Sequence, residues 1–402
     1  DVELCTREGY AEEHQGALLS TSCAADTGRG EGVFCFTMAI SAMAPGTPDR
    51  GVVAELTLAK SGQSAPLTAI SLSSDQRLAV VGGHGIMKVI RLAPEGLSEV
   101  ASLKIGRRKI TGSAGSKLSM YDVAWRPSGG NVAASLSNGG VAMWDLQHLS
   151  SSTSSSSSSQ SWAGQGQLRE ETGNIIGTHE RSVNRLSWNP FDHNMLLSGS
   201  QARHRQGRGG RNGDGFLKIW DLRCSKAVAT FDSRYGAVRD VQFSPLQEFH
   251  FAAVFDNGKL QIWDYKFKQP KMKIASHTKS ALSVEWHRTL PWRLATSSDK
   301  VVEIWDLTPP AVDRQQQKQQ PPKQQQQGPV MEQTLLSTIT LRSPGMVSRA
   351  KWRPGHPTQI ATAQVPPRLG DTDYAIMVHD ITDPAVPHFA LYGGDDKKNG
   401  FC

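Results

Sequence analysis

The sequence predicts an all-β protein built from a repeated unit of short strands, the organisation of a β-propeller. Residues 179–223 contain three short runs of alternating apolar and polar side chains separated by turns, and the last run ends in Trp220 followed by Asp. The same Trp-Asp ending recurs at Trp144, Trp263 and Trp305. Trp220 and Trp263 are 43 residues apart, and Trp263 and Trp305 are 42 apart. This spacing falls within the roughly 40–45 residues of a four-stranded propeller blade.

Six repeats are visible along the chain. They lie near residues 66–92, 118–146, 179–223, 235–265, 277–307 and 346–381. Residues 51–392 are therefore predicted to form the propeller, with six blades visible and seven in the full-length protein. Whether the ring closes with six or seven blades stays open, but an expected strand at Val52–Ala59 would supply the outer strand of a blade built from both chain ends.

Polar tracts flank and interrupt this propeller. Residues 1–50 are rich in Gly, Ala, Ser and Thr without sustained periodicity, so a disordered lead-in is predicted there, and residues 393–402 are expected to be a truncated tail. Three low-complexity insertions, rich in Ser, in Arg and Gly, and in Gln, are predicted to lie outside the core. They span residues 150–170, 202–213 and 309–330. Their role is not evident from composition.

Recurring polar residues are interpreted as structural joints of the blades. One set combines a histidine, a hydroxyl residue of the second strand (Ser198 or Ser200), an aspartate and a tryptophan, and a second set repeats the order with Thr296 or Ser297. A hydrolase uses the same residue types, but two copies at blade spacing, each with an indole, favour buried structural networks. The residues assigned to blade structure are His179, Asp214, Trp220, His277, Asp299, Trp305, Trp144 and Trp263.

Composition and motifs predict no catalytic residues, metal site or cofactor. The chain of 402 residues is 38% hydrophobic with a formal charge of +7, typical of a folded protein with a mild basic excess. Its five cysteines form no Cys-x-x-Cys pair, so neither a disulfide framework nor a zinc site is indicated. The sequence contains no Walker loop, His-Glu-x-x-His or Gly-x-Gly-x-x-Gly motif. The apolar run Val33–Met43 is too short to span a bilayer as a helix.

Several segments resemble the amino-terminal propeller of the Sea2-like WD-repeat subunit of the SEA complex, called GATOR in animals. They are residues 104–125, Leu196–Gln201 with Asp214–Phe216, Val238–Ser244 and Arg349–Pro354. The resemblance covers about residues 66–390 and implies a WD40-type β-propeller. The helical region and the zinc-binding RING-type segment that follow the propeller in this family are absent from the chain. Whether the full-length protein carries a RING segment stays open.

The same resemblance implies a function. It implies a non-enzymatic protein-protein interaction scaffold, a subunit of a SEA/GATOR-type complex that positively regulates TORC1 signalling in response to amino acids. The implied partners are Seh1-like and other WD-repeat subunits. The implied location is cytoplasmic and peripheral at the lysosomal or vacuolar membrane, through the complex.

Two other functions are kept as alternatives. The segment Trp220–Arg223 fits the Trp-Asp-x-Arg ending of substrate receptors of cullin-RING ubiquitin ligases, whose arginine contacts an adaptor. Residues 203–211 resemble an arginine-glycine tract that binds RNA, although nucleic acid is the less favoured partner.

Partner contacts are expected on exposed loop residues of the rigid scaffold, since loops commonly carry recognition. The candidates are Arg181, Arg223, Tyr235 and Lys279. Which face each partner would use is not specified by the sequence.

Overall fold

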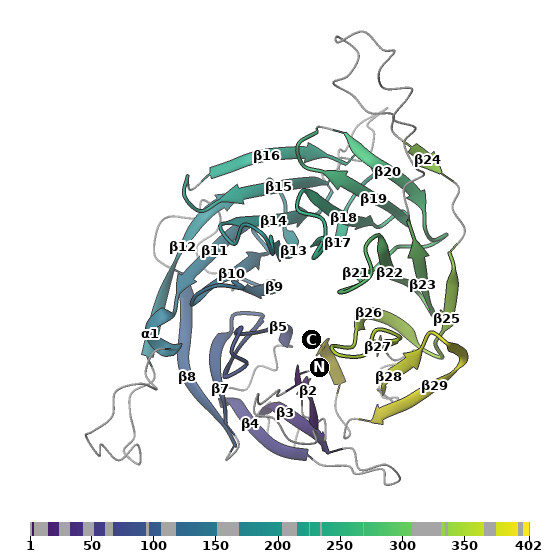
Figure 1. Ribbon diagram of the computed structural model, residues 1–402. Coiled ribbons are helices and arrows are strands. Elements are labelled where there is room, and N and C mark those ends of the chain that lie inside the picture. The colour runs from purple at the N-terminus through teal and green to yellow at the C-terminus, as the bar shows by residue number, and fades with distance from the viewer. Residues whose placement is uncertain are drawn as a thin grey trace, which may run out of the picture. The chain divides into compact units, whose positions relative to one another are not determined.

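Short antiparallel strands form nearly all of the regular structure in the computed structural model (Figure 1). The chain divides into two units, Asp1–Leu186 with Gly393–Cys402 (unit 1) and Ser187–Tyr392 (unit 2). The structure describes residues 2–3, 15–23, 33–42, 52–60, 67–93, 96–105, 118–150, 169–202, 215–224, 226–233, 235–267, 269–307, 331–333, 337–365, 375–392 and 397–401. The greater part of each predicted insertion lies outside these residues.

Unit 1 contains two four-stranded antiparallel blades that are joined into one eight-stranded sheet. The join is a parallel pairing of the two outer strands, β8 and β12, from Ala101 opposite Arg169 to Ile105 opposite Gly173. A short helix, α1 (Gln147–Ser150), follows β11. The strands are β5 (Leu67–Leu72), β6 (Leu78–Gly83), β7 (Met87–Ala93), β8 (Gly96–Ile105), β9 (Met120–Trp125), β10 (Asn131–Leu136), β11 (Gly140–Asp145) and β12 (Arg169–Thr178).

A further sheet of unit 1 is built from both ends of the chain. Strand β30 pairs with β2, and β4 lies at the edge of this sheet, as predicted for Val52–Ala59. The strands are β1 (Val2–Glu3), β2 (Gln15–Cys23), β3 (Val33–Ala42), β4 (Val52–Lys60) and β30 (Lys397–Phe401).

The prediction for the chain ends differs from this arrangement. Strands β1 to β3 lie within residues 1–50, where disorder was expected, and β30 lies in the expected tail. The average composition of residues 1–50 conceals the apolar run that becomes β3. A strand also gains backbone partners from distant residues, here β2 with β30, which composition does not encode. With this sheet the described residues form seven blades of four or five strands, one blade more than the repeats visible in the sequence.

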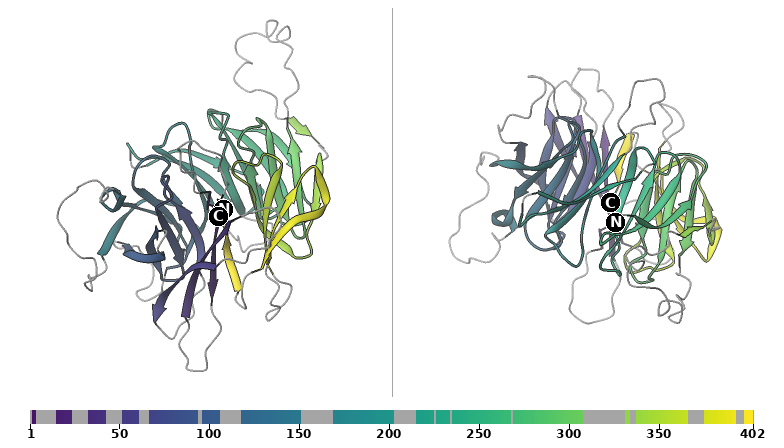
Figure 2. Two further views of the ribbon diagram at one scale, coloured as in Figure 1. Left: turned by 60° about the horizontal axis from the view of Figure 1, so that its bottom comes forward. Right: turned by 90° about the horizontal axis from the view of Figure 1, so that it is seen from above.

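Unit 2 contains the other four blades, each antiparallel and each connected in chain order, with β13 beginning in unit 1. Consecutive sheets of this unit pack against one another (Figures 1 and 2). A three-residue strand, β24 (Met331–Gln333), pairs in parallel with the outer strand β20. The strands are β13 (Val183–Trp188), β14 (Met195–Ser200), β15 (Phe216–Asp221), β16 (Lys226–Asp232), β17 (Val238–Phe243), β18 (His250–Phe255), β19 (Lys259–Asp264), β20 (Pro270–Ala275), β21 (Ser283–Trp286), β22 (Arg293–Ser298), β23 (Val301–Asp306), β25 (Ile339–Arg342), β26 (Met346–Trp352), β27 (Gln359–Val365), β28 (Ala375–Asp380) and β29 (Asp383–Tyr392).

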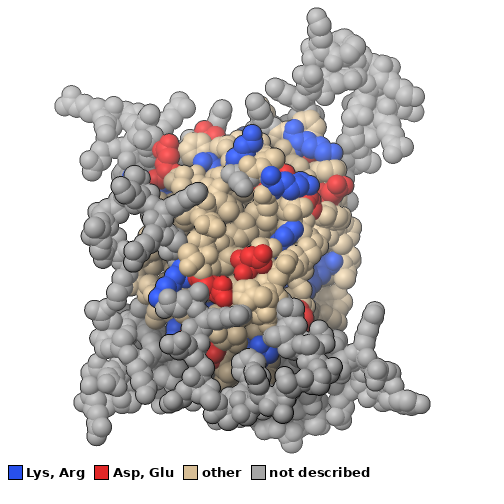
Figure 3. Space-filling model, turned by 90° about the vertical axis from the view of Figure 1, so that its left-hand side faces the viewer, with Lys and Arg blue, Asp and Glu red and all other residues tan. Residues whose placement is uncertain are grey.

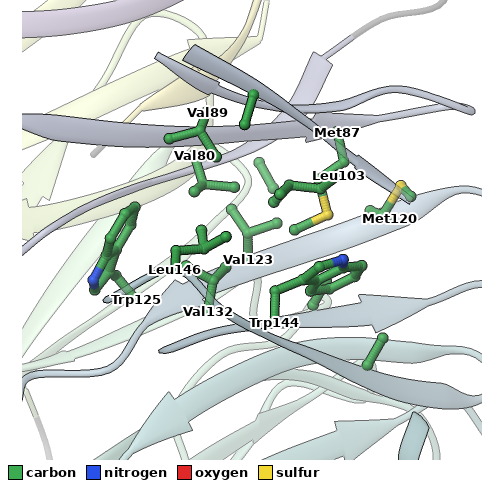
Figure 4. Packing of buried hydrophobic residues seen from close by; sticks show 14 of the residues in the cluster. Val80, Met87, Val89, Leu103, Met120, Val123, Trp125, Val132, Trp144 and Leu146 are labelled. Carbon is green, nitrogen blue, oxygen red and sulfur yellow. The ribbon is translucent and has the colours of Figure 1, made fainter. Parts of the chain in front are cut away.

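The core lies between the faces of neighbouring sheets. Second strands such as β10 and β18 are buried at nearly every residue, because they lie between two strands and also between two sheets. Outer strands such as β16 alternate between exposed and partly buried residues. In Figure 4, Val80 and Val89 of one blade face Val123 of the next. Burial of each such side chain contributes about 1.5–3 kcal/mol, which explains why a blade is stable only beside its neighbours.

Candidate functional site

The predicted joint in blade β21–β25 brings three of its four residues together. Trp305 Nε1 donates a hydrogen bond of 2.9 Å to Thr296 Oγ1, and His277 Nε2 lies 2.8 Å from the same oxygen. Of the two hydroxyls left open by the sequence, Thr296 is therefore the member of the joint, while Ser297 Oγ pairs with Ser283 Oγ. The Thr296 hydroxyl accepts the indole proton and donates its own to a neutral imidazole. The proton and one of the two lone pairs of the hydroxyl are then used.

Asp299 does not occupy the position expected of it. It lies in the two-residue turn between β22 and β23 with a φ of 47°, and its carboxylate forms an exposed ion pair with Lys279. A tight hairpin of this kind requires positive φ, and the turn directs the carboxylate to solvent. Glu303 faces the histidine instead, with its Oε2 3.6 Å from His277 Nδ1.

Burial keeps both members of this His277–Glu303 contact neutral over a shared pH range. Desolvation lowers the pKa of His277 to about 4 and raises the pKa of Glu303 to about 7. Between these values an uncharged imidazole faces an uncharged carboxyl. The contact therefore differs from an ion pair.

A rule of position explains which tryptophans use a hydroxyl. Trp220 and Trp305 lie opposite Leu196 and Leu294, and each bonds the hydroxyl two residues further along that second strand. For Trp220 this is Ser198 Oγ at 2.8 Å, whereas Ser200 Oγ bonds the backbone of Phe216. Of the other expected members of that joint, His179 is buried, and Asp214 lies outside the described residues.

The last repeat ends in His379-Asp380 in place of Trp-Asp, and it obeys the same rule. His379 takes the place of tryptophan in β28 and lies opposite Ile360, and two residues further on Thr362 Oγ1 is 3.5 Å from His379 Nε2. Burial lowers the pKa of His379, so its ring stays neutral beside the hydroxyl. The sequence change from tryptophan to histidine thus retains the joint.

Two tryptophans use other acceptors because the matching position is alanine. Trp263 Nε1 donates to Gln261 Oε1 at 3.1 Å, and Trp144 Nε1 donates to the carbonyl of Lys104 at 3.0 Å. The residues two positions beyond their partners are Ala253 and Ala134. All four Trp-Asp tryptophans are nevertheless buried with a bonded indole.

Sequence reasoning missed a second set of joints between the first strands of successive blades. A side-chain oxygen of one first strand accepts a hydrogen bond from a backbone N–H of the next. The pairs, acceptor first, are Ser71 with Trp125 (2.9 Å), Asp122 with Leu186 (2.9 Å), Ser187 with Phe243 (3.0 Å), Asp240 with Val284 (3.0 Å) and Ser283 with Ala350 (3.1 Å). The available signal was a polar residue within each of these first strands.

Ion pairing adds to these joints in unit 2. The carboxylate of Glu285, a buried side chain of β21, accepts a hydrogen bond of 2.8 Å from Gln242 Nε2 of β17. The same oxygen binds Lys351 Nζ of β26, so three consecutive first strands are linked.

The four candidate partner-binding residues fall into different environments. Arg181 and Lys279 are exposed in connections that precede a first strand. Tyr235 is half-buried, with its ring 6.0 Å from that of Phe255, and mainly contributes to packing. Arg223 follows the third strand β15 instead.

The Arg223 guanidinium is held by two aspartates. Nε donates to Asp221 Oδ1 at 2.9 Å and Nη2 donates to Asp192 Oδ2 at 2.8 Å. The Arg223 hydrogen bond lowers the pKa of Asp221, whereas the pKa of Asp192 is lowered, against the opposing effect of desolvation, first by hydrogen bonds from Asn194 and then by Arg223. Its side chain is 56% exposed. The arginine therefore ties two turns of one blade together while leaving part of its surface accessible.

The charges and ligand clusters of the described residues bear on nucleic-acid and metal binding. Residues 203–211 lie outside the described residues. On the side of the molecule shown in Figure 3, the described Lys and Arg are interspersed with Asp and Glu, without a stripe of one sign. Among described residues no group of three His, Cys, Asp or Glu is arranged to hold a metal, and no helix is long and apolar enough to cross a membrane.

Comparison with known proteins gives concordant results. The WD40 family (WD domain, G-beta repeat) matches residues 172–221 and 268–306. The GATOR2 complex protein WDR24 of Danio rerio is 29% identical over 84% of this chain, the human protein is 29% identical over 80%, and the Dictyostelium discoideum protein is 27% identical over 83%. This chain spans only 35%, 33% and 27% of the length of those relatives.

A solved structure supports the fold alone. A chain of the "Crystal Structure of Mitotic Checkpoint Complex" superposes with a TM-score of 0.55 at 17% sequence identity, covering 82% of this chain and 78% of that one. The chain thus contains WD40 repeats, has the WD40-type β-propeller fold, and is homologous over most of its length to the GATOR2 WDR24 (Sea2-like) proteins.

Proposed function

We propose that this chain is the propeller of a non-enzymatic scaffold subunit of a GATOR2-type (SEA-type) complex, which positively regulates TORC1 signalling in response to amino acids. The observation that carries the proposal is homology to proteins named for the GATOR2 complex across most of the chain, in animals and in Dictyostelium. The proposed partners are Seh1-like and other WD-repeat subunits. The proposed location is cytoplasmic and peripheral at the lysosomal or vacuolar membrane, through the complex.

The geometry of the joint formed by His277, Thr296 and Trp305 favours a scaffold function over hydrolase activity. His277 and Thr296 have the hydrogen bond of a base and a nucleophile, but Thr296 is 0% exposed and its oxygen is occupied by the Trp305 indole. A histidine with a pKa of about 4 is also a weak base near neutral pH. These residues stabilise a blade.

The adaptor-binding alternative is less favoured. Arg223 would have to contact an adaptor while its guanidinium is already held by Asp192 and Asp221. Substitution Arg223→Ala tests it: adaptor co-purifying with the wild type and lost in the variant would favour the ligase function. The relatives bear names of a different complex.

The proposed function is tested in cells that lack the full-length protein. Phosphorylation of TORC1 substrates after amino-acid refeeding should fall and should return when the full-length protein is restored. A deletion that leaves the refeeding response unchanged, in cells where other GATOR2-type subunits are needed for it, contradicts the proposal.

A further inference from the structure

Exposed apolar side chains gather in turns at one end of the unit 2 blades. We define the turn surface as Leu246, Phe267 and Leu290, which are 40%, 47% and 40% exposed. Leu246 lies between β17 and β18, Phe267 follows β19, and Leu290 lies between β21 and β22. Because strands alternate in direction, turns after the first and third strands emerge at the same end of a blade. The three residues therefore belong to one end of two consecutive blades.

Contacts between the two blades hold these turns in place. Trp292, two residues after Leu290, packs its ring against the His250 ring of the preceding blade at 5.0 Å. Lys271 Nζ of β20 lies 4.9 Å from the centre of the same indole and 3.3 Å from His250 Nε2. Within the preceding blade, the Phe249 ring packs at 5.6 Å against Tyr265, two residues before Phe267. The surface is thus carried by turns that are packed onto the scaffold.

The backbone at Trp292 is strained. Its φ of 63° lies in the left-handed region, which is rare for a bulky side chain and costs of the order of 1–3 kcal/mol. The contacts with His250 and Lys271 offset this strain. Backbone strain of this kind is concentrated at recognition sites, where it holds a loop in the conformation that binds a partner.

Three exposed cations lie on the turns and strands that carry the turn surface. Lys266, Lys271 and Arg288 are exposed, and among described residues none of them forms an ion pair with a carboxylate. Arg293 is neutralised by Asp306, with 2.7 Å between Nε and Oδ1. The nearby acids are Glu248, which is exposed, and Asp264 and Asp192, which also lie close enough to Tyr265 to act on it electrostatically. An approaching acidic group would therefore find three exposed cations that form no ion pair with the described residues.

We propose that the turn surface docks a protein segment that carries apolar side chains flanked by acidic residues. Apolar anchors at the centre of an interface supply most of the affinity, and complementary charges at the rim supply orientation and speed of association. The apolar side chains would cover Leu246, Phe267 and Leu290, and the acidic ones would meet the three cations. This inference goes beyond the scaffold assignment and does not depend on which complex the chain joins.

The test uses the purified chain and two fluorescent synthetic peptides, measured by anisotropy. Both peptides carry a short Leu/Phe core; one is flanked by Glu, the other by Lys. The acidic peptide should bind, and the Lys peptide should bind at least about tenfold more weakly. Leu290→Ser should weaken the acidic peptide about tenfold, which is the loss of a typical anchor. The paired reversal Lys266→Glu with Arg288→Glu should shift the preference to the Lys peptide.

Met346→Ser is the matched control. Met346 is 39% exposed, like Leu290, but it opens the first strand β26 at the other end of a unit 2 blade. This variant should bind the acidic peptide as the wild type does. Both serine variants should unfold at nearly the same temperature as the wild type, because substitutions at exposed positions change the free energy of unfolding by about 0.5 kcal/mol or less.

Three outcomes would overturn the proposal. The first is no binding of the acidic peptide, or equal binding of both peptides. The second is an equal loss for Leu290→Ser and Met346→Ser. The third is a concentration-dependent dimer, detected by light scattering, that Leu290→Ser abolishes, because the occupant would then be a second copy of the chain.

Discussion

The indole Nε1 of Trp144 donates a hydrogen bond of 3.0 Å to the carbonyl of Lys104, which lies 40 residues earlier in the sequence. This bond connects the third strand of one blade to the outer strand of the blade before it. It lies beside the parallel pairing of β8 and β12, in which Gly173 pairs with Ile105. Two blades of unit 1 are therefore joined by backbone pairing and by a buried side chain.

Gly173→Ala should destabilise unit 1 because the alanine Cβ would lie 2.3 Å from Trp144 Cε2. Overpacking of this kind costs about 1–3 kcal/mol, measurable by urea unfolding. Repeating the substitution in a Trp144→Leu background, where the indole is absent, should give a smaller loss. Equal losses in the two backgrounds would show that the indole does not set the requirement for glycine.

Thr296→Val should destabilise blade β21–β25 more than Thr296→Ser does. Valine keeps the shape but leaves the Trp305 N–H and the His277 ring without their shared partner, at a cost of about 1–3 kcal/mol for each buried group. Serine keeps the hydroxyl and loses only a methyl group. Chemical denaturation of the three proteins measures the difference, and similar losses for both variants would argue against the joint.

Glu303→Gln should make stability less dependent on pH. Burial raises the pKa of Glu303 from 4.5 to about 7, so the folded state favours the protonated carboxyl. The wild type therefore loses stability relative to the glutamine variant as pH rises from 4.5 to about 7, and the difference is constant above that. Unfolding free energies at pH 5 and pH 8 check the sign. A wild type that gains stability over this interval, relative to the variant, contradicts the assignment.

Lys351→Met should destabilise unit 2, because the buried Glu285 side chain would lose its cation and keep Gln242 as a side-chain donor. Removing one partner of a fully buried ion pair costs about 3–5 kcal/mol, and the expected loss is smaller here because the Lys351 side chain is 31% exposed. Adding Glu285→Gln should recover much of the loss. A double variant as unstable as Lys351→Met alone would indicate that packing, and not the unpaired charge, causes the effect.

The repeat architecture could be predicted from sequence because the Trp-Asp ending marks the third strand of a blade at a fixed spacing. The joint at Thr296 could also be predicted from the sequence, since its residue types recur in a fixed order. The position of Asp299 could not be predicted, because the direction of its carboxylate depends on a two-residue turn with positive φ. Sequence order alone does not report that geometry.

Pairing between distant segments explains the other differences. The sheet formed by β2 and β30 joins residues from both chain ends, and the parallel contact of β8 with β12 crosses from one repeat to the next. Neither leaves a periodic signal within one repeat. The bonds from Asp122 and Asp240 to the next blade were missed because a polar residue in a first strand also fits an exposed position.

Affinity purification of the full-length protein from its own cells tests the central claim most directly. The account predicts that Seh1-like and Sec13-like propellers are recovered with it in comparable amounts, and that this recovery survives Arg223→Ala. Recovery of a cullin adaptor in their place, lost in Arg223→Ala, would contradict it.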